Sequence, residues 1–199
     1  MKNKKVWKRI IKEYHGKYYD KYESDGAVHW DWYEDENCQY RKMVDDSIAP
    51  FRNYTNVKRG TLLDLGCGDG LISYRLKEMG FEVTGVDENH IGLLFAQARA
   101  GIKTIEADLN TFMPKKEYDY AICVDTIEHL KNPENIKNIL KKINKFAVIV
   151  TDDDYNLTKA SVYHQTQYTK EEFEELFKGY RLEKIPMRIK YFFGYKIIV

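Results

Sequence analysis

A glycine-rich turn between an apolar segment and an amphipathic segment constrains this chain more than any other feature. Thr61–Leu65 has the apolar run of a buried strand, and Gly70–Met79 has the apolar spacing of a helix. Gly66, Gly68 and Gly70 stand in the turn between them. Because glycine lets the backbone bend sharply and approach a ligand, this pattern predicts a strand-loop-helix unit with a binding site on its loop. The alternative is a tight turn without a ligand.

Residues 60–199 alternate between short apolar runs and helical stretches, which is typical of an α/β fold with a parallel sheet. Asn89 and Asn132 are placed to begin helices, and Thr169 with Glu172 forms a capping box. The last two strands are joined by a short link, so they must pair antiparallel. Strands are expected at Thr61–Leu65, Phe81–Val86, Ile102–Ala107, Tyr118–Val124, Phe146–Thr151, Tyr180–Ile185 and Tyr191–Val199.

Residues 1–59 have a different character, with helical stretches rich in aromatic and charged residues and no clear strand. We expect a helical cap on a single domain of residues 1–199, with the core in 60–199, rather than a second domain. Exposing many large rings together is costly, so most should pack on the core, while His29–Tyr33 can also form a lid over a ligand. The aromatic residues concerned are Trp7, Tyr14, Tyr18, Tyr19, Tyr22, Trp30, Trp32 and Tyr33.

Charge and composition exclude several classes of protein. Lys and Arg total 32 against 31 Asp and Glu, and this neutral balance disfavours a nucleic-acid partner. No apolar run is long enough to cross a membrane. The three cysteines are an odd number without the spacing of a metal site, which favours the reducing cytoplasm.

Three aspartates stand at the ends of the first three predicted strands: Asp64 just before the glycine loop, and Asp87 and Asp108 directly after the second and third strands. Asp64 can accept hydrogen bonds from an ammonium group and would repel a pyrophosphate. Asp87 can accept the two hydroxyls of a ribose. Asp108 can bind the amine of an adenine ring, or it can serve only as a turn residue. Loops of this kind bind a dinucleotide or S-adenosylmethionine, and the Gly-x-Gly-x-Gly spacing opposes the dinucleotide.

Four motifs together resemble the class I S-adenosylmethionine-dependent methyltransferases: Leu63–Gly70, Gly85–Asp87, Glu106–Asp108 and Tyr118–Leu130. The resemblance covers residues 60–199. It implies a Rossmann-like, mostly parallel seven-stranded sheet of order 3-2-1-4-5-7-6, with strand 7 antiparallel and helices on both faces. It also implies that S-adenosylmethionine binds at the carboxyl ends of the strands and leaves as S-adenosylhomocysteine. The cofactor-binding residues would be Asp64, Gly66, Cys67, Gly68, Gly70, Asp87, Glu88, Asp108, Leu109 and Asp125.

The turn after the fourth predicted strand resembles that of methyltransferases acting on small molecules. We expect His129 to be the general base, because histidine titrates near neutral pH, with Glu128 and His164 completing the catalytic group. The alternative is that Glu128 and His129 only hold the turn. Some relatives bind a divalent ion here, which would require Asp125, Glu128, His129 and His164 as ligands. Since Asp125 is shorter than the glutamate of those relatives, the expected site has no metal.

The expected function is therefore methyl transfer to an oxygen or nitrogen of a small-molecule acceptor. A non-catalytic S-adenosylmethionine-binding partner subunit and an RNA 2′-O-methyltransferase are the alternatives, and a nicotinamide-dependent oxidoreductase is opposed by the glycine spacing. The sequence indicates neither the acceptor nor the oligomeric state.

Overall fold

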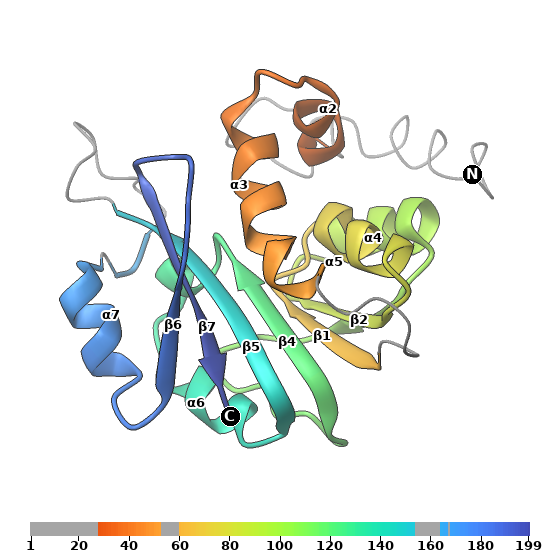
Figure 1. Cartoon of the computed structure of the whole chain (residues 1–199). Helices are drawn as coiled ribbons and strands as arrows, with labels where there is room; N and C mark the ends of the chain where they lie inside the picture. The colour runs from red at the N-terminus through yellow and green to blue at the C-terminus, as the bar shows by residue number, and fades with distance from the viewer. Residues whose placement is uncertain (1–27, 53–59, 154–163, 167) are drawn as a thin grey trace.

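A seven-stranded sheet forms the centre of the computed structural model, which describes residues 28–52, 60–153, 164–166 and 168–199 (Figure 1). Its strands are β1 (Thr61–Leu65), β2 (Glu82–Asp87), β3 (Lys103–Glu106), β4 (Tyr118–Val124), β5 (Ile143–Asp152), β6 (Arg181–Ile185) and β7 (Phe192–Ile198). The order β3-β2-β1-β4-β5-β7-β6 confirms the predicted topology. β1 to β5 pair in parallel, and β7 runs antiparallel to both β5 and β6.

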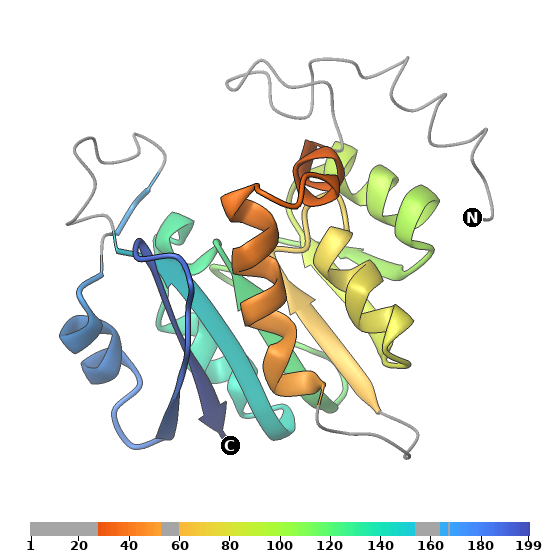
Figure 2. The ribbon, with the colours of Figure 1, turned by 45° about the horizontal axis from the view of Figure 1, so that its top comes forward.

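Helices cover both faces of this sheet (Figure 2). They are α2 (Val28–Glu34), α3 (Gln39–Ile48), the 3₁₀ turn η1 (Ala49–Phe51), α4 (Leu71–Glu78), α5 (His90–Phe95) with the π-helical turn η2 (Ala96–Ala100), η3 (Ile127–His129), α6 (Asn135–Leu140) and α7 (Lys170–Leu176). Apolar residues of α3, α4 and α5 form one core with the sheet. Those of α6 and α7 form the second core on the opposite face.

The central strands are apolar on both sides, as a parallel sheet covered by two helical layers requires. In β1, Leu62 joins the core under α3 and α4, and Leu63 joins the core under α6 and α7. Ile122 and Cys123 divide in the same way in β4. The predicted strand ends agree with the structure to within one residue, except that β5 begins at Ile143 rather than Phe146.

Two of the three predicted helix starts are confirmed. The Asn89 side chain accepts hydrogen bonds from the first turn of α5, and Thr169 forms the expected capping box with Glu172. The third prediction is wrong, because Asn132 does not cap α6, which begins three residues later, at Asn135. The Asn132 side chain instead donates to the backbone oxygen of Asn110 at 3.1 Å, so it links two loops.

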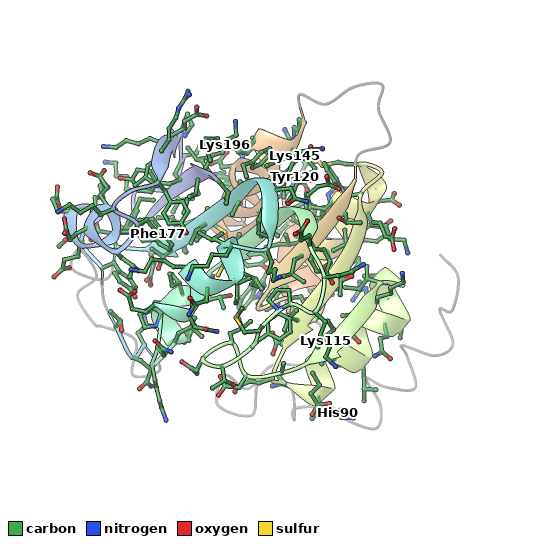
Figure 3. The ribbon with its side chains drawn as sticks, turned by 90° about the horizontal axis from the view of Figure 1, so that it is seen from below. His90, Lys115, Tyr120, Lys145, Phe177 and Lys196 are labelled. Atoms are coloured by element: carbon green, nitrogen blue, oxygen red, sulfur yellow. The ribbon has the colours of Figure 1, made fainter. Side chains whose placement is uncertain are left out.

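Aromatic rings and lysines close the edge of the sheet where β4 and β5 begin, seen from below in Figure 3. The Lys145 Nζ lies 4.8 Å from the centre of the Tyr120 ring and donates to its hydroxyl at 3.2 Å. The Lys196 Nζ lies 4.8 Å from the centre of the Phe146 ring. Side chains therefore pack over this end of the strands, and the glycine loop lies at the opposite end, where the parallel strands finish.

The part of the chain that the structure describes contains no helix that is both long and apolar enough to span a membrane. The predicted packing of Trp7, Tyr14, Tyr18, Tyr19 and Tyr22 lies outside the described residues.

Candidate functional site

The glycine loop, residues 66–70, leaves the carboxyl end of β1 and leads into α4. Gly66 and Gly70 have φ angles of +78° and +81°, in the region that favours glycine. A Cβ on Gly66 would lie 2.2 Å from the Thr126 hydroxyl oxygen, and a Cβ on Gly70 would lie 2.8 Å from the Cα of Ala96. The loop therefore needs glycine both for its conformation and for its close contacts with Thr126, which follows β4, and with η2.

The end of β2 holds this loop in place. The backbone nitrogen of Gly66 donates to the oxygen of Val86 at 2.8 Å. One carboxylate oxygen of Asp87 accepts from the backbone nitrogen of Gly68 at 2.8 Å, and the other accepts from that of Asn89 at 2.8 Å. Burial raises the pKa of Asp87 against the opposing effect of these hydrogen bonds. The predicted ribose-binding residue is thus also part of the loop's support.

Asp64 is a buried carboxylate near the end of β1, separated from the loop by one residue. Its side chain accepts a hydrogen bond from the Ser73 hydroxyl at 2.6 Å, and the residue is only 2% exposed. Burial, with a smaller contribution from Asp87, raises the pKa of Asp64 to about 7. A positive charge placed beside Asp64 would favour its ionised form, so this position suits the ammonium group of a ligand.

The carboxyl end of β4 carries a second pair of acids. Asp125 has a φ of +53°, the one positive φ among the described non-glycine residues, and such a conformation costs about 1–3 kcal/mol. Three residues later, Glu128 is 1% exposed and accepts from the Thr151 hydroxyl at 2.9 Å. Burial, and then the neighbouring Asp125 carboxylate, raise the pKa of Glu128 well above its usual range. Strain and a buried acid therefore coincide at the end of β4.

The predicted catalytic residues meet at this point. The backbone oxygen of Glu128 accepts from the backbone nitrogen of Gln165 at 2.8 Å, which brings the neighbouring His164 onto η3. The rings of His129 and His164 lie edge to face with centres 4.7 Å apart. A carboxylate oxygen of Asp152 lies 3.6 Å from the Nδ1 of His164. The structure thus brings together three residues from two separate segments of the sequence.

Glu128, His129 and His164 can each direct one ligand atom to a common point, because these atoms all lie within 4.8 Å of one another. One carboxylate and two imidazoles form a donor set suited to a divalent transition-metal ion. Asp125, the fourth residue of the metal-binding alternative, lies outside this group. The three residues fit either a metal ion or an acid-base group.

The adenine side of the predicted site is more open. Asp108 is exposed, and its carboxylate accepts from the backbone and side-chain nitrogens of Asn110 at 2.8 and 2.6 Å, which is the turn role given above as its alternative. A carboxylate has further lone pairs, so this role leaves room for a ligand amine. Leu109 is buried and Glu88 is exposed.

Trp30 joins the cap to the core and to the glycine loop, beside buried residues of α3 and η1 such as Ile48 and Phe51. The Trp30 side chain is 8% exposed, with the Arg99 guanidinium 4.4 Å from the centre of its ring and the Tyr74 ring 5.0 Å away. Its Nε1 donates to the backbone oxygen of Asp69 in the glycine loop at 3.0 Å. Trp32, by contrast, is 45% exposed. The packing role expected of the cap thus holds for Trp30 but not for Trp32.

Asp69 is the site residue that the sequence analysis missed. It stands inside the glycine motif, yet it is 1% exposed, and its Oδ2 accepts from the backbone nitrogen of His29 at 3.2 Å. The Nδ1 of His29 lies 3.2 Å from its other oxygen. A buried carboxylate needs a hydrogen-bond donor or a positive charge beside it, so an acid inside this tight loop was the available signal. Nothing in the spacing could show that the partner stands 40 positions earlier.

The arrangement suits a ligand that carries positive charge and hydroxyl groups. Backbone nitrogens of the loop stand beside several carboxylates, which would repel a diphosphate. The strand order and the loop at the carboxyl ends define the class as the Rossmann-like methyltransferase fold. Residues 36–187 match the family model described as a methyltransferase domain, and the chain belongs to this family.

One curated relative is a ubiquinone biosynthesis O-methyltransferase of Rickettsia canadensis, which is 34% identical over 107 residues. That alignment covers 50% of this chain and 45% of the relative, so the chain spans about half the length of the curated relatives it matches.

Two solved structures share the fold. The magnesium protoporphyrin IX methyltransferase of Synechocystis PCC 6803, with bound SAH, has a TM-score of 0.67 and 17% identity over 96% of this chain and 99% of that one. The N-methyltransferase NodS of Bradyrhizobium japonicum, also with SAH, has a TM-score of 0.70 and 15% identity over 84% of this chain and 90% of that one.

Proposed function

We propose that the chain is an S-adenosylmethionine-dependent methyltransferase that acts on an oxygen or nitrogen of a small-molecule acceptor. The placement of Asp64 just before the glycine loop, and of Asp87 in contact with it, carries this proposal. The first suits the ammonium group of the methionine part, and the second suits the ribose. The names of the relatives agree with it, since they are methyltransferases and two of the solved structures hold SAH.

The cofactor would lie across the carboxyl ends of β1 to β4. Asp108 and Leu109 would face its adenine, and Glu88 would stand beside the ribose. Asp125, at the strained end of β4, would lie near the methionine part. The remaining contacts would come from the backbone of the loop at Gly66, Cys67, Gly68 and Gly70.

The acceptor would lie beside Glu128, His129 and His164. A divalent ion held by these three residues would bind the acceptor oxygen and lower its pKa. Without an ion, His129 would remove the acceptor's proton while the buried Glu128 orients the group. In both cases the protein aligns the acceptor with the methyl group and keeps water away from it.

Titration calorimetry tests the cofactor. S-Adenosylmethionine and S-adenosylhomocysteine should both bind, whereas NADH should not. Tight binding of NADH alone would overturn the proposal in favour of an oxidoreductase. Formation of S-adenosylhomocysteine is then followed with phenols, catechols and amines. If the cofactor binds but no acceptor class supports turnover, the chain is better explained as a non-catalytic partner subunit.

Metal analysis of the purified protein distinguishes the two roles open to Glu128, His129 and His164, namely metal binding and acid-base catalysis. If Glu128, His129 and His164 hold an ion, it should be present at close to one equivalent and should be lost in His164→Ala. His90→Ala is the matched control, because His90 also contacts a carboxylate, at 2.8 Å from Glu106, but is exposed and stands outside the group. No metal in the wild type, together with loss of turnover in His129→Ala, would favour the acid-base role.

We also propose that residues 1–199 form one domain that acts in the cytoplasm. Cap residues such as Trp30 and Phe51 share a core with β1 and β4, and all three cysteines are free.

A further inference from the structure

The helix α2 of the cap stands above the carboxyl end of β1, where its first residues contact the glycine loop (Figure 2). Asp69 receives three contacts from this helix. Its carboxylate accepts from the backbone of His29 and lies 3.2 Å from the His29 ring, and its backbone oxygen accepts from the Trp30 indole. The imidazole of His29 is 18% exposed. The cap therefore places an ionisable ring over the loop that would bind the cofactor.

Carboxylates from three elements act on this ring. Asp69 in the loop is in contact with it, and Asp125 after β4 and Asp87 at the end of β2 act from farther away. The ring also stacks on Tyr40 of α3, with ring centres 5.0 Å apart. Burial lowers the pKa of His29, but Asp69 first, and then Asp125 and Asp87, raise it above its usual value. The acids thus favour a positive charge on His29.

In the proposed function the cofactor binds beside the glycine loop and these acids, so methyl transfer would change the charge near His29. The sulfonium carries one positive charge. When the C–S bond breaks, its electron pair stays on sulfur, the methyl carbon bonds to the acceptor oxygen or nitrogen, and the acceptor's proton leaves to a base. The cofactor product is therefore a neutral thioether, and the surrounding carboxylates lose a positive neighbour.

We propose that the His29 imidazole carries the positive charge of the cofactor cleft whenever the sulfonium does not. His29 releases its proton to solvent when S-adenosylmethionine binds, and takes up a proton from solvent once the cofactor has become S-adenosylhomocysteine. His29 is then the residue by which the protein distinguishes its charged methyl donor from the neutral product. This inference rests on the proposed function, and it is independent of which residue removes the acceptor's proton.

Binding of the sulfonium and protonation of His29 oppose each other. Two positive charges among the same acids repel each other, so the bound sulfonium lowers the pKa of His29. At pH values between the lowered and the raised pKa, S-adenosylmethionine binding releases a proton. Its affinity therefore falls as the pH falls through that window, by at most about tenfold per pH unit. S-Adenosylhomocysteine has no sulfonium, so its affinity should lack this dependence.

Calorimetry of both cofactors in two buffers of different ionisation enthalpy, at about pH 6.5, the ordinary pKa of histidine, measures the protons released. We expect more proton release with S-adenosylmethionine than with S-adenosylhomocysteine. Asp64 also titrates near neutral pH, but it would face the ammonium group that both cofactors share, so the difference between the two isolates the sulfonium.

In His29→Gln the difference in proton release should disappear. Tyr33→Phe is the matched control on the same helix, because it removes only the hydrogen bond from Tyr33 to Asp45, and the difference should persist. If His29→Gln does not fold, Asp69→Asn provides the test, since it removes the main cause of the raised pKa and should move the proton release to lower pH.

The outcomes separate this inference from the proposed function. If neither cofactor binds the wild type, the proposed function itself fails. If both bind and release equal numbers of protons, or if the difference survives in His29→Gln, the role of His29 is excluded while the methyltransferase remains.

Discussion

The burial of Asp64 makes the stability of the fold depend on pH. This residue is enclosed at the end of β1, where its side chain accepts a hydrogen bond from the Ser73 hydroxyl. Because burial raises the pKa of Asp64 to about 7, its contribution to folding stability is present at acid pH and is lost as the pH rises toward and through 7. The cofactor-free protein therefore bears the cost of an ionised Asp64 at alkaline pH.

Asp64→Asn should remove this cost and also remove the partner of the ammonium group. The free energy of unfolding of the variant relative to the wild type should increase by about 2 kcal/mol between about pH 5 and about pH 8. Denaturant unfolding at the two pH values measures this, and calorimetry should show weaker binding of both cofactors. A stability difference that does not change with pH would show that Asp64 does not titrate in this range.

Gly70→Ala should distort the loop. The new Cβ would meet the backbone of Ala96, and position 70 has a φ of +81°, which an alanine rarely adopts. The free energy of unfolding should therefore fall by about 3 kcal/mol or more, and cofactor binding should be lost. Gly179→Ala is the control, because Gly179 has a φ of +99° but no atom within 4 Å of the added Cβ. It should cost only about 1–2 kcal/mol and leave binding intact. Equal losses in both variants would mean that strain, rather than contact, requires glycine at position 70.

At the scale of elements, α2 is the part of the cap that contacts the glycine loop. The ring of Trp30 contacts Arg99 and Tyr74, and its indole nitrogen donates a hydrogen bond to the backbone of the glycine loop. Apolar packing and a directional hydrogen bond therefore come from one side chain, and they can be separated experimentally.

Trp30→Phe keeps an aromatic ring in the core but removes the hydrogen bond to Asp69. We expect a loss of unfolding free energy of about 1–2 kcal/mol and weaker cofactor binding, because the loop loses its support. Trp32→Phe, at an exposed position on the same helix, should change stability by less than about 0.5 kcal/mol. Thermal unfolding and calorimetry of the two variants make the comparison. Unchanged binding in Trp30→Phe would show that the cap does not support the loop through this bond.

At the scale of the whole molecule, cofactor binding should stabilise the fold. S-Adenosylmethionine at about 100 times its Kd should add about 2.7 kcal/mol to the free energy of unfolding and raise the Tm by about 5–10 °C. Differential scanning fluorimetry with NADH as the control ligand measures this. A Tm that rises equally with NADH would argue against a site selective for S-adenosylmethionine.

Most of the sheet could be predicted because a parallel strand between two helical layers must be apolar on both faces, and this pattern is local. Thr61–Leu65 and Tyr118–Val124 were predicted with their correct ends for that reason. The helix start predicted at Asn132 was wrong because the side chain of Asn132 bonds to Asn110, which lies in another loop. The contact of His29 with Asp69 was likewise beyond local patterns, since only the folded chain brings the cap to the loop.

The position of β7 between β5 and β6 has a consequence for the order in which the chain folds. The ribosome makes β6 before β7, yet β6 is an edge strand whose one neighbour in the described sheet is β7. While the nascent chain grows, β5 presents an unpaired edge that only a later segment can fill. Such an edge is prone to pair with other chains, so the interval before Phe192–Ile198 emerges is the stage of synthesis most exposed to aggregation.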